Sequence, residues 1–146
     1  MKNNKGFSLV ELIIVIAIMA VLVGVLAPTY LQYVEKSKKS NDVSSIDTIV
    51  NAVEIAAIDP LVVTDSTTTL KVTVTKSGMT LDPAAGGSSK WADAVKEAVS
   101  DAKLKSFDTV EFTATRDTAT GKVTFAYTAN TPQDFKDYAV QISKLQ

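Results

Sequence analysis

The chain begins with a long apolar segment that contains a single charged side chain. Between Phe7 and Ala27 that side chain is Glu11. A helix needs roughly 20 mainly apolar residues to cross the hydrocarbon core of a bilayer, and a backbone in lipid must satisfy its hydrogen bonds within the helix. The pattern therefore predicts a membrane-spanning helix over residues 7–28. Pro28 ends the apolar run. A proline removes one backbone hydrogen bond, so we expect a kink or break in the helix there.

After Pro28 the spacing of apolar residues changes to that of an amphipathic helix. Apolar side chains recur every three or four positions, with polar residues over much of the remaining surface. The residues of this stripe are Val43, Ile46, Val50, Val53 and Ala57. We expect the stripe to pack on a globular partner. Asp59-Pro60 should end the helix, so residues 29–59 form its amphipathic half.

Residues 60–146 show the short alternating patterns of a small α+β head. Alternation of apolar and polar residues predicts strands at 70–75, 110–114 and 123–127, the last two forming a hairpin around 117–121. Helices should begin after Ser88 or Ser89 and after Thr131-Pro132. The predicted fold is therefore α+β, with the long N-terminal helix packed on a three-stranded antiparallel sheet and two further helices.

Glu11 separates the possible interpretations of the apolar segment. A secretory signal peptide has a shorter apolar region with a small-residue cleavage site after it, and a buried core helix would lack residues to surround it. An ordinary single-pass anchor remains an alternative. Since an ionisable group inside a membrane segment is costly, Glu11 is a functional candidate by default.

The string Lys5-Gly6-Phe7-Ser8-Leu9-Val10-Glu11, with the apolar tail that follows, resembles the N-terminus of a type IV prepilin of the short-leader class. The resemblance covers about residues 5–33. It implies that residues 1–6 are a leader, that a prepilin peptidase cuts between Gly6 and Phe7, and that Phe7 becomes an N-methylated terminus. It also implies that Glu11 neutralises a terminal amine within the growing filament. A lone buried charge would cost far more than such a pair.

The same resemblance implies assembly through the N-terminal helix. Gly24 and Pro28 lie in the stretch that loses helical order when pilin subunits pack into a filament. The expected partners are identical or related pilin subunits, the prepilin peptidase and the inner-membrane assembly platform. Lysines flank the span on both sides, so charge alone does not fix its orientation. The resemblance implies that the N-terminus is cytoplasmic while the protein is in the membrane. It also implies that the assembled protein forms an extracellular pilus with a role in adhesion or motility.

Two alternatives to a pilus subunit stay open from the sequence. One is a pseudopilin of a competence or type II secretion system, which shares the N-terminal motif. The other is a membrane-anchored binding module that never polymerises. The threonine-rich head favours a surface-exposed pilin over a pseudopilin only slightly.

Composition argues against most other functions. The chain has 15 basic and 16 acidic residues and lacks histidine and cysteine, so no strong basic field attracts nucleic acid and the common metal clusters and nucleophile–base pairs are missing. We expect a non-enzymatic protein without cofactor or metal. The lysines at 36–39 and 103–105 form two short charge clusters, interpreted as solvated faces. The absence of cysteine points to a Gram-positive or anaerobic source.

Overall fold

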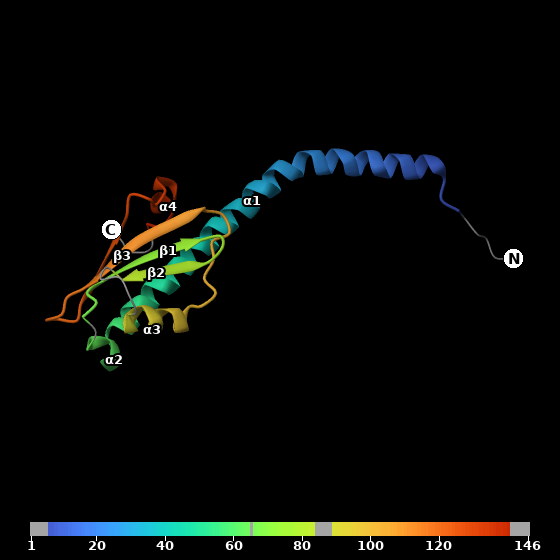
Figure 1. The fold of residues 1–146 in the computed structure, drawn as a ribbon. Helices are drawn as coiled ribbons and strands as arrows, with labels where there is room; N and C mark the ends of the chain where they lie inside the picture. The colour runs from blue at the N-terminus through green and yellow to red at the C-terminus, as the bar shows by residue number, and fades with distance from the viewer. Residues whose placement is uncertain (1–5, 65, 84–88, 141–146) are drawn as a thin grey trace. The chain divides into compact units, whose positions relative to one another are not determined.

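The computed structural model describes residues 6–64, 66–83 and 89–140 (Figure 1). The chain divides into two compact units, residues 1–36 and 37–146, and each is described by itself. Helix α1, Leu9–Ala57, runs through both units. The remaining described elements belong to the second unit.

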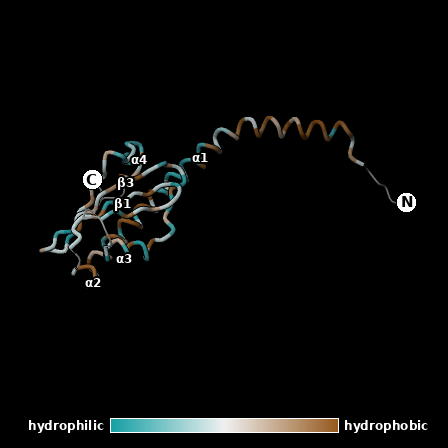
Figure 2. The backbone as a smooth tube through the Cα atoms, viewed as in Figure 1, coloured by the Kyte–Doolittle hydropathy of each residue, from teal (hydrophilic) through white to brown (hydrophobic). Residues whose placement is uncertain are grey.

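The first unit is the apolar part of α1. The helix begins at Leu9 and continues without interruption through Pro28. Its apolar side chains are exposed; Val10, Leu22 and Leu26, for example, each keep more than half of their accessible surface. Within the described residues, α1 is the one helix long and apolar enough to cross a membrane. Figure 2 shows this stretch as an almost continuous hydrophobic coil, as expected for a surface that lipid or other subunits cover.

The second unit is built on a four-stranded antiparallel sheet. The strands are β1 (Thr69–Thr75), β2 (Met79–Pro83), β3 (Thr109–Arg116) and β4 (Val123–Tyr127), in the order β2-β1-β3-β4. The prediction of three strands was wrong in number, because β2 was interpreted as part of a loop. This strand is short, lies at the sheet edge and contains no fully buried residue. Apolar and polar residues alternate over only four positions before Pro83, and the Asp82-Pro83 pair was interpreted as a loop signal.

Three short helices accompany the sheet. α3 (Lys90–Ala98) follows the predicted cap, since the Ser89 hydroxyl oxygen accepts the N–H of Ala92. α4 (Gln133–Tyr138) follows Pro132 as predicted. α2, Pro60–Val63, was not predicted; it is a single turn whose N-cap is Asp59. The part of the last predicted helix beyond residue 140 lies outside the described residues.

The second half of α1 lies along one face of the sheet (Figure 1) and supplies the predicted apolar stripe. Val43 is half-buried, and the other four residues of the stripe are buried. They join one core with the inward side chains of β1, β3 and β4 and with Trp91 of α3. The indole Nε1–H of Trp91 donates to the Val53 carbonyl at 3.0 Å, which ties α3 to α1. The predicted α+β class is confirmed.

A buried carboxylate fixes the loop after α3 to α1. Asp42 is fully buried, and its carboxylate accepts backbone N–H groups from Lys105, Ser106 and Phe107 at 2.6, 2.7 and 3.0 Å. Three N–H donors satisfy a charge that would otherwise be costly to bury. As a result, Lys105 lies beside the part of α1 that begins this unit and carries Lys38 and Lys39.

Candidate processing and assembly site

The peptide bond between Gly6 and Phe7 lies in an exposed segment just before α1. Residues 6–8 are outside any helix or strand, and the Phe7 side chain is 87% exposed. A Cβ built on Gly6 would meet no atom within 4 Å. Glycine is therefore not required here by packing within the chain. An exposed, non-helical bond is the form of substrate that a peptidase can bind in an extended conformation.

Glu11 lies in the first turn of α1 and contacts the backbone that precedes the helix. Its Oε2 accepts the backbone N–H of Ser8 at 2.9 Å. Ser8 immediately precedes the helix and Glu11 follows three residues later, as in half of a capping box. A negative charge at this position also interacts favourably with the helix dipole. The carboxylate is therefore held at the end of the helix where Phe7 lies.

No role of Ser8 was predicted from the sequence. The signal was nevertheless present, because Ser8-Leu9-Val10-Glu11 has the Ser-x-x-Glu spacing of an N-terminal capping box. This finding gives Glu11 a local function within its own subunit. It is compatible with the predicted neutralisation of a terminal amine, since one carboxylate offers two oxygens and several acceptor positions.

Gly24 and Pro28 are one helical turn apart in the apolar part of α1. Pro28 has no N–H to donate to the Gly24 carbonyl, which is its i−4 position. A Cβ at Gly24 would meet no atom within 4 Å. Both residues lower helix stability, yet the segment is helical in the isolated chain. Any loss of helical order here upon assembly stays a prediction.

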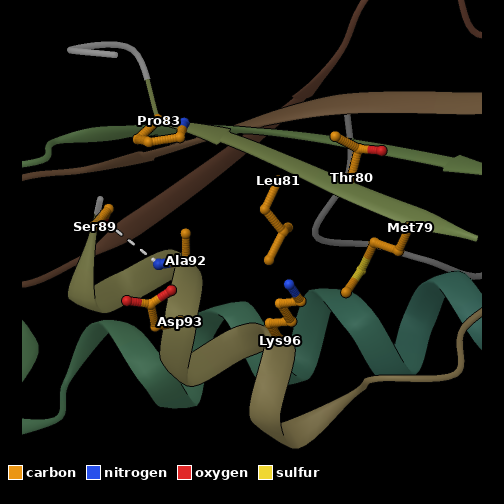
Figure 3. Close-up of a pocket in the computed structure, with 8 residues that line it drawn as sticks. All are labelled: Met79, Thr80, Leu81, Pro83, Ser89, Ala92, Asp93 and Lys96. Atoms are coloured by element: carbon orange, nitrogen blue, oxygen red, sulfur yellow. Dashed lines mark hydrogen bonds between the residues drawn. The ribbon is translucent and has the colours of Figure 1, made fainter. Parts of the chain in front are cut away.

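The head contains a small cavity of about 240 Å³ between β2 and α3 (Figure 3). Met79 and Leu81 line one side, and Asp93 and Lys96 of α3 line the other. The Ser89 hydroxyl at its edge serves as the α3 cap. Within the described residues, no group of three or more His, Cys, Asp or Glu side chains could hold a metal ion.

Comparisons with known proteins point to the same N-terminal site. Residues 1–27 match the family described as "Prokaryotic N-terminal methylation motif". The chain is 34% identical over 68 residues to a "Fimbrial protein" of Pseudomonas aeruginosa, covering 47% of this chain and 44% of that protein. It is 37% identical over 59 residues to "Fimbrial protein Q" of Moraxella bovis, covering 40% and 38%.

A third relative is the "Type IV major fimbrial protein FimA" of Dichelobacter nodosus, 36% identical over 56 residues, with 38% of this chain and 36% of that protein covered. The chain thus spans less than half the length of the curated relatives it matches. No solved structure shows a significant match. Together with the α+β fold and the apolar N-terminal helix, these matches confirm the predicted resemblance to the type IV pilins.

Proposed function

We propose that this chain is the precursor of a type IV pilus subunit, cut by a prepilin peptidase after Gly6 and polymerised into an extracellular filament through its N-terminal helix. The observation that carries the proposal is the arrangement at the start of α1. An exposed Gly6-Phe7 bond lies directly before a membrane-type helix whose first turn holds Glu11. The names of the relatives support a fimbrial function.

In this proposal the leader keeps the N-terminus of the precursor from acting in assembly. Cleavage creates a new amine on Phe7, which is then N-methylated and remains positively charged. Glu11 of a neighbouring subunit offers an opposite charge, and the Ser8 N–H holds the Glu11 carboxylate at the N-terminal end of α1. Two charges buried together cost much less than either one alone. The exposed apolar side chains of α1 exchange lipid for neighbouring helices during assembly.

The processing step is tested with Gly6→Leu in the full chain. A bulky side chain at Gly6 should block cleavage through contacts with the peptidase, because it meets nothing within its own chain. Intact-mass analysis of the membrane fraction should show the uncut precursor. Asn4→Leu adds the same side chain two residues upstream and should still be trimmed to Phe7. A Gly6→Leu chain that is trimmed normally would contradict the proposed cleavage site.

The type of assembly is tested on the wild-type chain. Sheared surface material should contain long fibres whose subunits begin at methylated Phe7. The same terminus without long fibres would favour a pseudopilin of a competence or secretion system. An intact Met1 in the mature protein would indicate a membrane-anchored module that does not polymerise.

A further inference from the structure

A groove of about 500 Å³ lies between the end of α1 and α3 in the second unit. Four alanines and Ile55 form most of its wall, and small side chains allow another chain to approach the helices closely. The alanines are Ala52, Ala56, Ala94 and Ala98. Ile55 is 68% exposed, so its side chain remains available to a partner.

Three further exposed apolar side chains follow Ile55 along the chain. Ile58, Leu61 and Val63 are 66%, 70% and 59% exposed. All three lie between the end of α1 and the end of α2. Contiguous exposed apolar surface is characteristic of interaction sites in folded proteins. We call the groove together with these three residues the α1–α3 surface.

The charged residues that line the groove are both acidic. Glu97 is exposed and takes part in no ion pair within the described part of the chain. Asp59 uses one oxygen, Oδ1, to accept the N–H of Leu61 at 2.8 Å. Because no lysine or arginine lines the groove, a partner with basic side chains is favoured.

The opposite charge gathers at the other end of the same unit. The Asp42 carboxylate holds the backbone of Lys105 beside α1, and the Lys39 ammonium lies 5.6 Å from the Phe107 ring centre. Lys38 precedes Lys39 on α1 and is exposed, and Lys103 is exposed in the same loop as Lys105. We call these four lysines the basic end. The α1 segment from Lys38 to Ile55 is about 26 Å long at 1.5 Å per residue.

We propose that the α1–α3 surface binds the basic end of a second copy of this chain. The contact deepens the proposed pilus function, on which it rests, because it joins two different surfaces of identical subunits. Such a head-to-tail contact does not close on itself unless the rotation forms a ring, and otherwise repeats into a helical filament. Charge complementarity sets the register: Lys38 meets Glu97, while the apolar side chains around Ile55 lose water.

Charge reversal in the full chain tests this contact. Glu97→Lys and Lys38→Glu each place like charges across the interface, which costs enough to reduce assembly by about tenfold or more. The double variant restores attraction with the signs exchanged and should recover most of the filament yield. Lys122→Glu, an exposed charge reversal in the β3–β4 turn, is the control and should leave the yield unchanged. Yield is measured as sheared filament relative to the membrane pool.

A second measurement uses the absence of cysteine from the chain. Filaments carrying both Lys38→Cys and Glu97→Cys should form intermolecular disulfides on mild oxidation. Filaments carrying Lys122→Cys with Glu97→Cys should form many fewer. Cross-linked ladders from the first pair alone would support the contact without relying on a destabilised variant.

The outcomes separate this contact from the pilus proposal. Wild-type filaments with methylated Phe7, normal yield in both charge reversals and no cross-link would overturn the contact and leave the pilus function standing. A lower yield in Lys38→Glu that Glu97→Lys fails to rescue would also overturn it, because the lysines would then meet another partner such as anionic lipid. Wild-type protein that keeps Met1 and forms no fibres would instead overturn the pilus function.

Discussion

The backbone N–H of Ser8 donates a 2.9 Å hydrogen bond to Oε2 of Glu11, so the carboxylate at the start of the apolar helix already has a partner within its own subunit. This bond is the glutamate half of an N-terminal capping box, in which the side chain at the third helical position accepts the backbone N–H of the N-cap residue. Capping needs an acceptor oxygen, whereas neutralising an amine needs a charge. The observed cap and the proposed charge neutralisation can therefore be separated by substitution.

Glu11→Gln keeps an oxygen that can accept the Ser8 N–H but removes the charge. If the charge neutralises the Phe7 amine of a neighbouring subunit, both Glu11→Gln and Glu11→Ala should abolish filaments while the protein accumulates in the membrane. Leaving one side of a buried pair alone costs on the order of 3–5 kcal/mol. Immunoblots of sheared filament and membrane pool measure the effect, with Glu35→Gln outside the apolar run as control. Normal filaments from Glu11→Gln would reduce Glu11 to a helix cap.

The second prediction concerns Asp42 and the loop that it holds. Asp42→Ala leaves three backbone N–H groups, those of residues 105–107, without their acceptor. The bonds of the Lys105 and Ser106 N–H groups are only partly buried, so water can replace their acceptor, whereas the bond of the Phe107 N–H is buried. An unsatisfied buried group costs about 1–3 kcal/mol, so a fragment starting at Tyr33 should lose about that much unfolding free energy. Asp47→Asn on the exposed side of the same helix should change it by less than about 0.5 kcal/mol. Urea denaturation followed by circular dichroism compares the two. Equal stabilities would show that the loop is held by other contacts.

Much of the fold could be predicted because its elements carry strong periodicity. The stripe from Val43 to Ala57 has helical spacing, and β1, β3 and β4 alternate clearly. The missed elements are too short to carry a strong periodic signal. β2 is an edge strand of half-exposed and exposed residues, and α2 is a single turn that depends on the Asp59 cap.

The polar contacts also differ in how far they could be predicted from the sequence. Glu11 and its Ser8 donor are three residues apart, so a local motif can identify them. Asp42 and its donors at 105–107 are more than sixty residues apart, and the loop has no sequence pattern that would pair them. The alternation at 110–114 predicted the strand that carries Glu111, but it could not show that Glu111 is buried and bonded to the segment after β4.

Glu111 carries the third prediction, which concerns acid stability. Its carboxylate accepts hydrogen bonds from Thr128, Thr73 and Asn130 at 2.5, 3.2 and 3.2 Å, and the Lys71 Nζ lies 3.0 Å away. Burial alone would raise the pKa of Glu111, but the hydrogen bonds and the Lys71 charge together outweigh it, so the pKa lies below its ordinary value of 4.5.

A lowered pKa in the folded state contributes stability above the unfolded value, and that contribution is lost as the pH falls through the folded pKa. The unfolding free energy of the fragment should therefore decline below about pH 4.5. Glu111→Gln should make this decline shallower. Asp108→Asn is the matched control, because Lys76 also lowers the pKa of Asp108, by a hydrogen bond and by its charge, but the pair is exposed and screened by solvent. An equal acid slope in wild type and Glu111→Gln would contradict the prediction.

The last prediction concerns Tyr127, whose hydroxyl oxygen is buried without a hydrogen-bond partner in the part of the chain that the structure describes. Its ring contacts Phe135 edge-on at 6.2 Å, and the Lys136 ammonium lies 5.7 Å from the ring centre. Burial disfavours the phenolate and raises the pKa of Tyr127 from 10.0 to about 12. Folding thus favours the protonated form, and this contribution to stability is fully present below pH 10 and lost as the pH rises toward 12.

Ultraviolet titration of the folded fragment should show one tyrosinate signal with a midpoint near pH 12. Tyr127→Phe should remove that signal and should not destabilise the fragment at neutral pH, because it deletes a buried hydroxyl that has no partner to lose. Tyr138→Phe, on the exposed side of α4, should retain the signal. If wild type and Tyr127→Phe titrate alike while circular dichroism shows that both remain folded, the Tyr127 hydroxyl is accessible to water and the packing of α4 against β4 is looser than the structure indicates.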